Sequence, residues 1–133
     1  MSKYSLHRYR IYMFIQGLTV VAVLSLFRLI PERNLAGLIA GILFVCVSSG
    51  VWLYELRFGR AFRSLSFWGC VLFLVISALP ILFIRLAHWG IPWNSLVVLG
   101  WTGPQWHQFS NLMFGLMLMS HFLDALWEAR RRS

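Results

Sequence analysis

Four long runs of apolar residues, separated by short segments that carry charge, proline or glycine, make up most of the chain. They cover residues 11–30, 35–56, 65–87 and 107–129. A helix that crosses a bilayer needs about 20 mainly apolar residues, and each run has that length. The pattern therefore predicts an all-α membrane protein, a four-transmembrane-helix bundle that forms a single transmembrane domain over residues 1–133.

The connection between the third and fourth runs differs from the others. Residues 85–106 contain two prolines, three glycines and four tryptophans around a short apolar stretch. This stretch is too short to cross the membrane, and tryptophan prefers the interface between lipid and water. We expect a Trp-rich segment that lies in the interface, with a shallow re-entrant turn as the alternative.

Composition supports a membrane protein. Of the 133 residues, 59% are hydrophobic and 12% are charged, whereas soluble domains are about 45–50% apolar and about 25% charged. The net charge of +8 would suggest a nucleic-acid partner on a soluble chain. Here the basic residues flank apolar runs, where they set topology and contact lipid head groups, so we expect no nucleic acid as a partner.

The basic residues also predict an orientation. Four crossings place nine of them on one side and three on the other; the nine are Lys3, Arg8, Arg10, Arg57, Arg60, Arg63, Arg130, Arg131 and Arg132, and the three are Arg28, Arg33 and Arg85. Because lysine and arginine are retained in the cytoplasm, both termini are predicted to be cytoplasmic, in a bacterial inner membrane. No small-residue cleavage site follows the first run, so we expect this helix to be retained.

Acidic residues are few and lie near the ends of the runs. Glu55, Asp124 and Glu128 lie within about two helical turns of the predicted cytoplasmic face. We expect them to form salt bridges with Arg57, Arg60, Arg63 and the C-terminal arginines. Carboxylates near the membrane midplane, which many small transporters use, are missing from the sequence.

Two features predict how the helices pack. Gly37 and Gly41 form a G-x-x-x-G motif, which lets a second helix approach closely. Pro80 lies within the third run and predicts a kink there, because proline removes the hydrogen bond to the carbonyl of Ile76.

The four histidines are the residues whose arrangement most favours a cofactor-binding site. His107 and His121 are fourteen residues apart, which corresponds to about 21 Å along one helix face. His88 is predicted near His107, and His7 on the same side of the membrane as His121. This spacing resembles the four-helix membrane cytochromes b, in which one helix carries two histidines fourteen apart that ligate two stacked haems.

The resemblance covers His107, His121 and His7 on a matching four-span layout, and it implies haem b and an interaction with quinone. Those cytochromes carry a partner histidine near the outer end of the second span. This chain has the sequence Glu-Arg-Asn-Leu there, at residues 32–35. His88, from a different helix, would have to replace that partner.

His121 has a second interpretation that needs no cofactor. Asp124 follows at i+3 on the same helix face, so the two side chains are expected to form a polar pair at the inner face. A lipid-modifying enzyme built on this pair and the nearby arginines is a further alternative, although no spacing in the sequence favours it.

No set of catalytic groups stands out, and no site for a metal is predicted. We therefore expect a small accessory or structural subunit that packs against membrane lipids, other membrane protein subunits or itself. The alternative is a b-type haem electron carrier with bis-histidine ligation.

Overall fold

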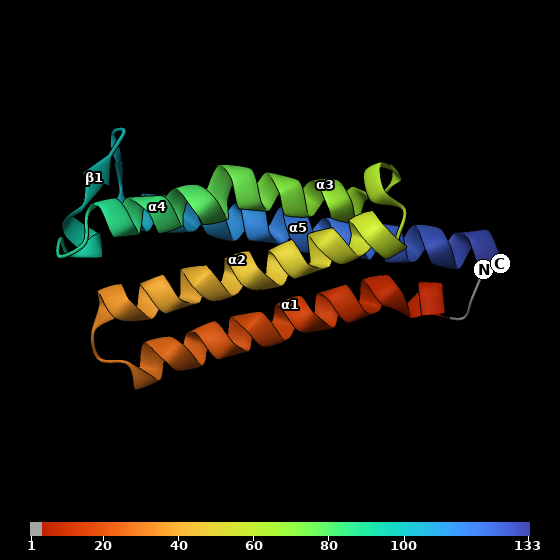
Figure 1. The fold of residues 1–133 in the computed structure, drawn as a ribbon, viewed down its shortest axis with the longest axis horizontal. Coiled ribbons are helices and arrows are strands. Elements are labelled where there is room, and N and C mark those ends of the chain that lie inside the picture. The colour runs from red at the N-terminus through yellow and green to blue at the C-terminus, as the bar shows by residue number, and fades with distance from the viewer. Residues whose placement is uncertain (1–3) are drawn as a thin grey trace.

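A computed structural model of the chain describes residues 4–133. Within them lie four helical spans long and apolar enough to cross a membrane, as the sequence predicted. The spans are α1 (Tyr4–Leu29), α2 (Arg33–Phe58), a third span built from α3 (Leu65–Leu72), η2 (Phe73–Ala78) and α4 (Leu79–Ala87), and α5 (Gly103–Arg132). They run side by side, and α1 begins at the end of the bundle where α5 ends (Figure 1). We call this the termini end.

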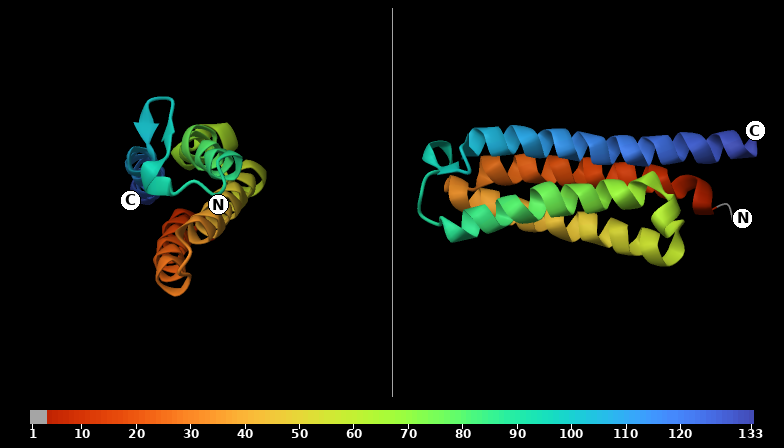
Figure 2. Two further views of the ribbon diagram at one scale, coloured as in Figure 1. Left: turned by 90° about the vertical axis from the view of Figure 1, so that its left-hand side faces the viewer. Right: turned by 90° about the horizontal axis from the view of Figure 1, so that it is seen from above.

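The spans form a closed ring of packed neighbours. Helix α1 packs against α2 and α5, α2 also packs against the third span, and α3 packs against α5 (Figure 2). Most large apolar side chains on the outside of the ring are exposed, as expected for a surface that faces lipid. The buried core is correspondingly small and holds Tyr9, Tyr12, Val51, Cys70, Phe73, Leu74, Ala78 and Met117.

Helix α5 begins four residues earlier than the apolar pattern predicted, because a capping box fixes its start. The Oγ1 atom of Thr102 accepts a hydrogen bond from the Gln105 amide at 3.3 Å, and the Gln105 side chain accepts one from the Thr102 amide at 2.9 Å. Pro104 in the first turn favours the same start. Hydropathy alone could not detect this polar turn.

The Trp-rich segment folds into a short 3₁₀ turn, η3 (Trp93–Ser95), followed by an antiparallel hairpin of β1 (Val97–Val98) and β2 (Trp101–Thr102). The hairpin stands at the end of the bundle opposite the termini, which we call the hairpin end (Figure 1). Leu99 and Gly100 between the strands both have positive φ, at 52° and 80°, as in a two-residue hairpin turn. The position of this segment in a membrane interface stays a prediction.

Just before Pro80, where the sequence predicts a kink, the third span contains a wider helical turn. The six residues of η2, Phe73–Ala78, are π-helical and end two residues before the proline. A π turn accommodates a residue that cannot donate to the regular backbone pattern. The Ser77 hydroxyl donates to Ser110 Oγ on α5 at 2.9 Å and so ties this segment to the fourth span.

Candidate functional site

A polar cluster at the termini end centres on the buried carboxylate of Glu55. Its Oε1 atom accepts hydrogen bonds from the Tyr9 hydroxyl at 2.9 Å and the Arg60 amide at 3.0 Å. Its Oε2 atom accepts from Arg8 Nε at 3.0 Å and the Tyr12 hydroxyl at 2.8 Å. Glu55 has no exposed surface, and these four donors saturate its oxygens. We call these five residues the Glu55 cluster.

The local sequence explains why the Glu55 cluster forms. Tyr9 and Tyr12 are three residues apart and therefore share one face of α1, which turns toward α2. Gly59 follows Glu55 by one helical turn, and a Cβ atom there would overlap the carboxylate. The absence of a side chain at Gly59 lets Glu55 fold back toward the end of α2. The ion pair with Arg8 neutralises the buried charge and joins the first two spans.

A second polar cluster joins α5 to the start of the third span. The Asp124 carboxylate accepts hydrogen bonds from the backbone amides of Leu65 at 3.2 Å and Ser66 at 2.6 Å. These amides belong to the first turn of α3, where helical amides lack partners and the helix dipole favours a negative charge. Arg60 Nη1 lies 3.8 Å from both Asp124 and Glu128.

These contacts correct one part of the predicted ion pairing. Arg60 does pair with Asp124 and Glu128, as the sequence predicted. The ion-pair partner of Glu55 is Arg8 rather than Arg57, Arg60, Arg63 or a C-terminal arginine. Arg8 lies next to Tyr9 on α1, which packs against α2, and its Nη2 donates to the Tyr9 hydroxyl at 2.8 Å.

The predicted direct pair between His121 and Asp124 is replaced by an indirect link through Ser66. His121 Nδ1 lies 2.8 Å from the Ser66 hydroxyl, while Asp124 binds the Ser66 amide. Two amides at a helix start bind a carboxylate better than a single imidazole does, which explains the change. Both side chains therefore hold the start of α3.

The surroundings of His121 do not fit a haem. The imidazole has no exposed surface, and the Tyr12 ring lies 5.4 Å from its centroid on the α1 side. His7, the proposed partner, is exposed at the termini end. His121 Nε2 is buried and finds no hydrogen-bond partner among residues 4–133, but Tyr12 would have to leave the Glu55 cluster to admit a porphyrin.

The other two histidines lie at the hairpin end, on either side of Arg85. His88 is half-buried, and its Nδ1 lies 3.1 Å from the Ile84 carbonyl of its own helix. His107 and Arg85 line one cavity, and His88 and Arg85 line a neighbouring one. In the described part of the chain, no group of three or more His, Cys, Asp or Glu side chains is placed to hold a metal ion.

Arg85 itself is packed into the bundle. Its residue exposure is 8%, and its guanidinium lies over the Trp93 ring with Cζ at 4.0 Å from the centroid. A Cβ atom at Gly37 would overlap the guanidinium, and one at Gly41 would come within 3.2 Å of Leu82. The G-x-x-x-G motif on α2 therefore faces α4 of the same chain, and its first glycine makes room for the arginine.

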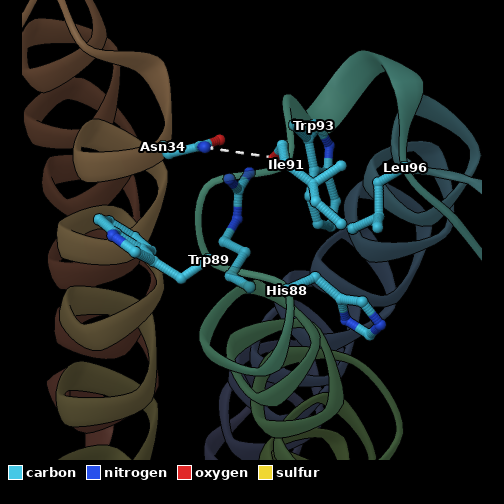
Figure 3. Close-up of a pocket in the computed structure, with 7 residues that line it drawn as sticks. Asn34, His88, Trp89, Ile91, Trp93 and Leu96 are labelled. Carbon is cyan, nitrogen blue, oxygen red and sulfur yellow. Dashed lines mark hydrogen bonds between the residues drawn. The ribbon is translucent and has the colours of Figure 1, made fainter.

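The neighbouring small pocket is closed by the Trp-rich segment. Asn34 Nδ2 donates to the Ile91 carbonyl at 3.2 Å, which connects the start of α2 to the chain after α4. Figure 3 shows Asn34 on one side of this pocket and Trp93 and Leu96 on the other. The pocket volume is about 10 Å³, so it is nearly filled by protein.

Two larger openings lie toward the termini end. One is an apolar groove of about 490 Å³ between α1 and α2, lined by Ile11, Ile15, Val47, Gly50 and Val51 together with Arg8, Tyr12 and Tyr54. The other is a basic pocket of about 410 Å³, lined by Gly59, Arg60, Arg63, Trp127 and Arg131. We call the second one the arginine pocket.

Sequence reasoning missed the roles of Tyr9, Tyr12 and Ser66. Tyrosines near the ends of membrane spans commonly lie in an aromatic belt at the interface, whereas Tyr9 and Tyr12 are buried and donate to Glu55. Two sequence features could have revealed the cluster. The tyrosines have i, i+3 spacing beside an arginine, and the next span carries Glu55 and Gly59 one helical turn apart.

Comparison of the chain with protein-family models, with curated proteins and with solved structures gives no match.

Proposed function

We propose that this protein is a structural component of the membrane that binds an anionic phospholipid head group at its termini end. The arginine pocket carries the proposal. Its lining includes three guanidinium groups and no carboxylate. Basic pockets beside membrane-spanning helices on the cytoplasmic side are suited to phosphate-bearing head groups.

The arginine pocket is organised around one tryptophan. The Cζ atoms of Arg60 and Arg131 lie 4.1 Å and 4.0 Å from the centroid of the Trp127 ring. Stacking on an aromatic face holds a planar guanidinium in place. Arg60 already pairs with Asp124 and Glu128 and donates to the Arg63 carbonyl, so Arg63 and Arg131 are the groups proposed to bind the ligand. A phosphate accepts paired hydrogen bonds from such a group, which a single flexible lysine does not provide.

A structural function agrees with how the acidic side chains are used. Glu55 on α2 binds Arg8 on α1, Asp124 binds the start of α3, and Glu128 faces Arg60. All three carboxylates are buried and lie against another segment of the chain, although Glu128 makes only the 3.8 Å contact with Arg60. This favours a packing component over a lipid-modifying enzyme.

The proposal retains the predicted orientation. With both termini in the cytoplasm of a bacterial cell, the arginine pocket would face the inner leaflet of the plasma membrane, where anionic lipids attract basic residues. An apolar groove between α1 and α2 at the same end would accommodate lipid chains or an apolar helix.

The test compares two double variants of equal charge in native mass spectrometry of protein extracted in mild detergent. Arg63→Gln with Arg131→Gln removes two exposed arginines of the pocket, whereas Arg28→Gln with Arg33→Gln removes two exposed arginines near the hairpin end. We expect phosphatidylglycerol adducts on the wild type and the second variant and their loss from the first.

Equal retention of lipid by both variants would contradict the proposal. Detection of a second membrane protein, or of a second copy of this chain, in place of lipid would assign the termini end to a protein partner instead.

A further inference from the structure

The hairpin end contains a buried positive charge that the protein does not neutralise. Arg85 has 8% of its surface exposed. Its guanidinium takes part in none of the ion pairs or hydrogen bonds formed among residues 4–133. Glu32, the acid at this end of the chain, is exposed in the turn before α2. Burying a guanidinium without an anion beside it costs free energy, and a bound anion next to Arg85 would reduce that cost.

The side chain is held in a fixed place rather than free to reach water. On one side it lies against the backbone of α2 at Gly37, and on another it stacks on Trp93. Arginines near the ends of membrane helices usually extend toward the interface. Here the Trp93 ring covers the guanidinium and keeps it within the bundle.

A cavity of about 50 Å³ adjoins Arg85, and all four spans line it. His107 and Ser110 of α5 contribute to the same lining. The Ser110 oxygen accepts the proton of Ser77, which leaves the Ser110 hydroxyl proton available for a ligand. Three side chains that can donate hydrogen bonds therefore line this cavity, and none of its lining residues is acidic.

The geometry points to a binding site for a small inorganic anion, of the size of a halide, between Arg85, His107 and Ser110. The cavity exceeds the roughly 10–15 Å³ that one water needs, and it admits a halide with a water. The rest of its lining is apolar, with Val23, Phe27 and Phe44 among its members. A weakly hydrated monovalent anion is better suited to such walls than sulfate or phosphate.

Trp93 offers a nearby readout. Its ring does not line the cavity, but it stacks on the Arg85 guanidinium, so an iodide bound to that guanidinium places a heavy-atom quencher next to the indole. The full-length protein is placed in nanodiscs of zwitterionic lipid and titrated with sodium iodide, with ionic strength held constant by sodium gluconate. We expect a saturable component of quenching that chloride competes away. Trp93→Phe should remove this component and leave the collisional quenching of the other tryptophans.

Three variants test whether the saturable quenching arises from iodide bound beside Arg85. Arg85→Gln should abolish it, whereas Arg33→Gln, which removes an exposed arginine at the same end, should leave it unchanged. Ser110→Ala, a small change on α5, should raise the half-saturating iodide concentration by about fivefold, as expected for one lost hydrogen bond. It also provides the test if Arg85→Gln does not fold.

Purely linear quenching in the wild type, or equal half-saturation in the wild type and Ser110→Ala, would overturn the inference. The same titration in nanodiscs that contain phosphatidylglycerol distinguishes the source of the anion. Loss of iodide binding there would show that the site takes a lipid phosphate, and it would also overturn the halide assignment.

Discussion

Replacing Glu55 by glutamine tests how far the Glu55 cluster stabilises the bundle. The carboxylate accepts four hydrogen bonds at 2.8–3.0 Å and has no exposed surface. A glutamine amide has one acceptor oxygen, which serves two donors at most, and its NH₂ group would face donors. At least two of the four bonds are therefore lost, and the Arg8 guanidinium loses its counter-charge.

The expected cost follows from these losses. A hydrogen bond to a charged group contributes about 1.5–3 kcal/mol, and breaking a buried ion pair from one side costs about 3–5 kcal/mol. Hydrogen bonds between membrane helices fall at the lower end of such values. We therefore predict that Glu55→Gln lowers the free energy of unfolding by about 3 kcal/mol.

Reversible unfolding in mixed micelles, followed by far-ultraviolet circular dichroism as the fraction of sodium dodecyl sulfate rises, measures this change. Glu32→Gln makes the same chemical substitution at an exposed acid and should shift the free energy of unfolding by less than about 0.5 kcal/mol. A shift below about 1 kcal/mol for Glu55→Gln would refute the reasoning, because it would mean that water or another group replaces the carboxylate at little cost.

Three further predictions follow from single contacts. Gly37→Ala should destabilise the fold by about 2 kcal/mol in the same micelle assay, since its Cβ would overlap a buried guanidinium, while Gly50→Ala, which adds a Cβ in open space, should not. Asp124→Asn should cost about 1–2 kcal/mol by weakening the binding of two α3 amides; an unchanged unfolding curve would argue against that role. In intact cells, a membrane-impermeant maleimide should label Ser95→Cys but not Ser133→Cys in a background without native cysteines, and the reverse pattern would invert the predicted orientation.

The number of spans could be predicted from the sequence because it depends on local hydropathy alone. Each run is long enough to cross a bilayer regardless of its neighbours, and the four spans of the structure follow the four runs. The π-helical turn could be predicted from the sequence only in part. Pro80 indicates a disturbance of the third span, but which type of turn absorbs it depends on packing against α5.

The clusters could not be predicted in the same way, because their partners lie far apart in the chain. Glu55 and Arg8 are 47 residues apart, and Asp124 and Ser66 are 58 apart. Spacing within one helix brings His121 and Asp124 to a shared face but says nothing about the amides that approach from α3. The i, i+3 rule names neighbours on a face, and tertiary packing decides which of them bond.

The π turn of the third span also determines which face of α4 is turned toward the rest of the bundle. A π turn holds one residue more than an α turn, and one residue corresponds to about 100° of rotation. Before η2 the span packs against both α5 and α2, and after it α4 packs mainly against α2. Deleting one residue from Phe73–Ala78 would restore a continuous α-helix of nearly the same hydropathy and length. The half of that helix that follows residue 78 would turn by about 100°, carry Arg85 away from Gly37, and present to lipid a charge that now lies within the bundle.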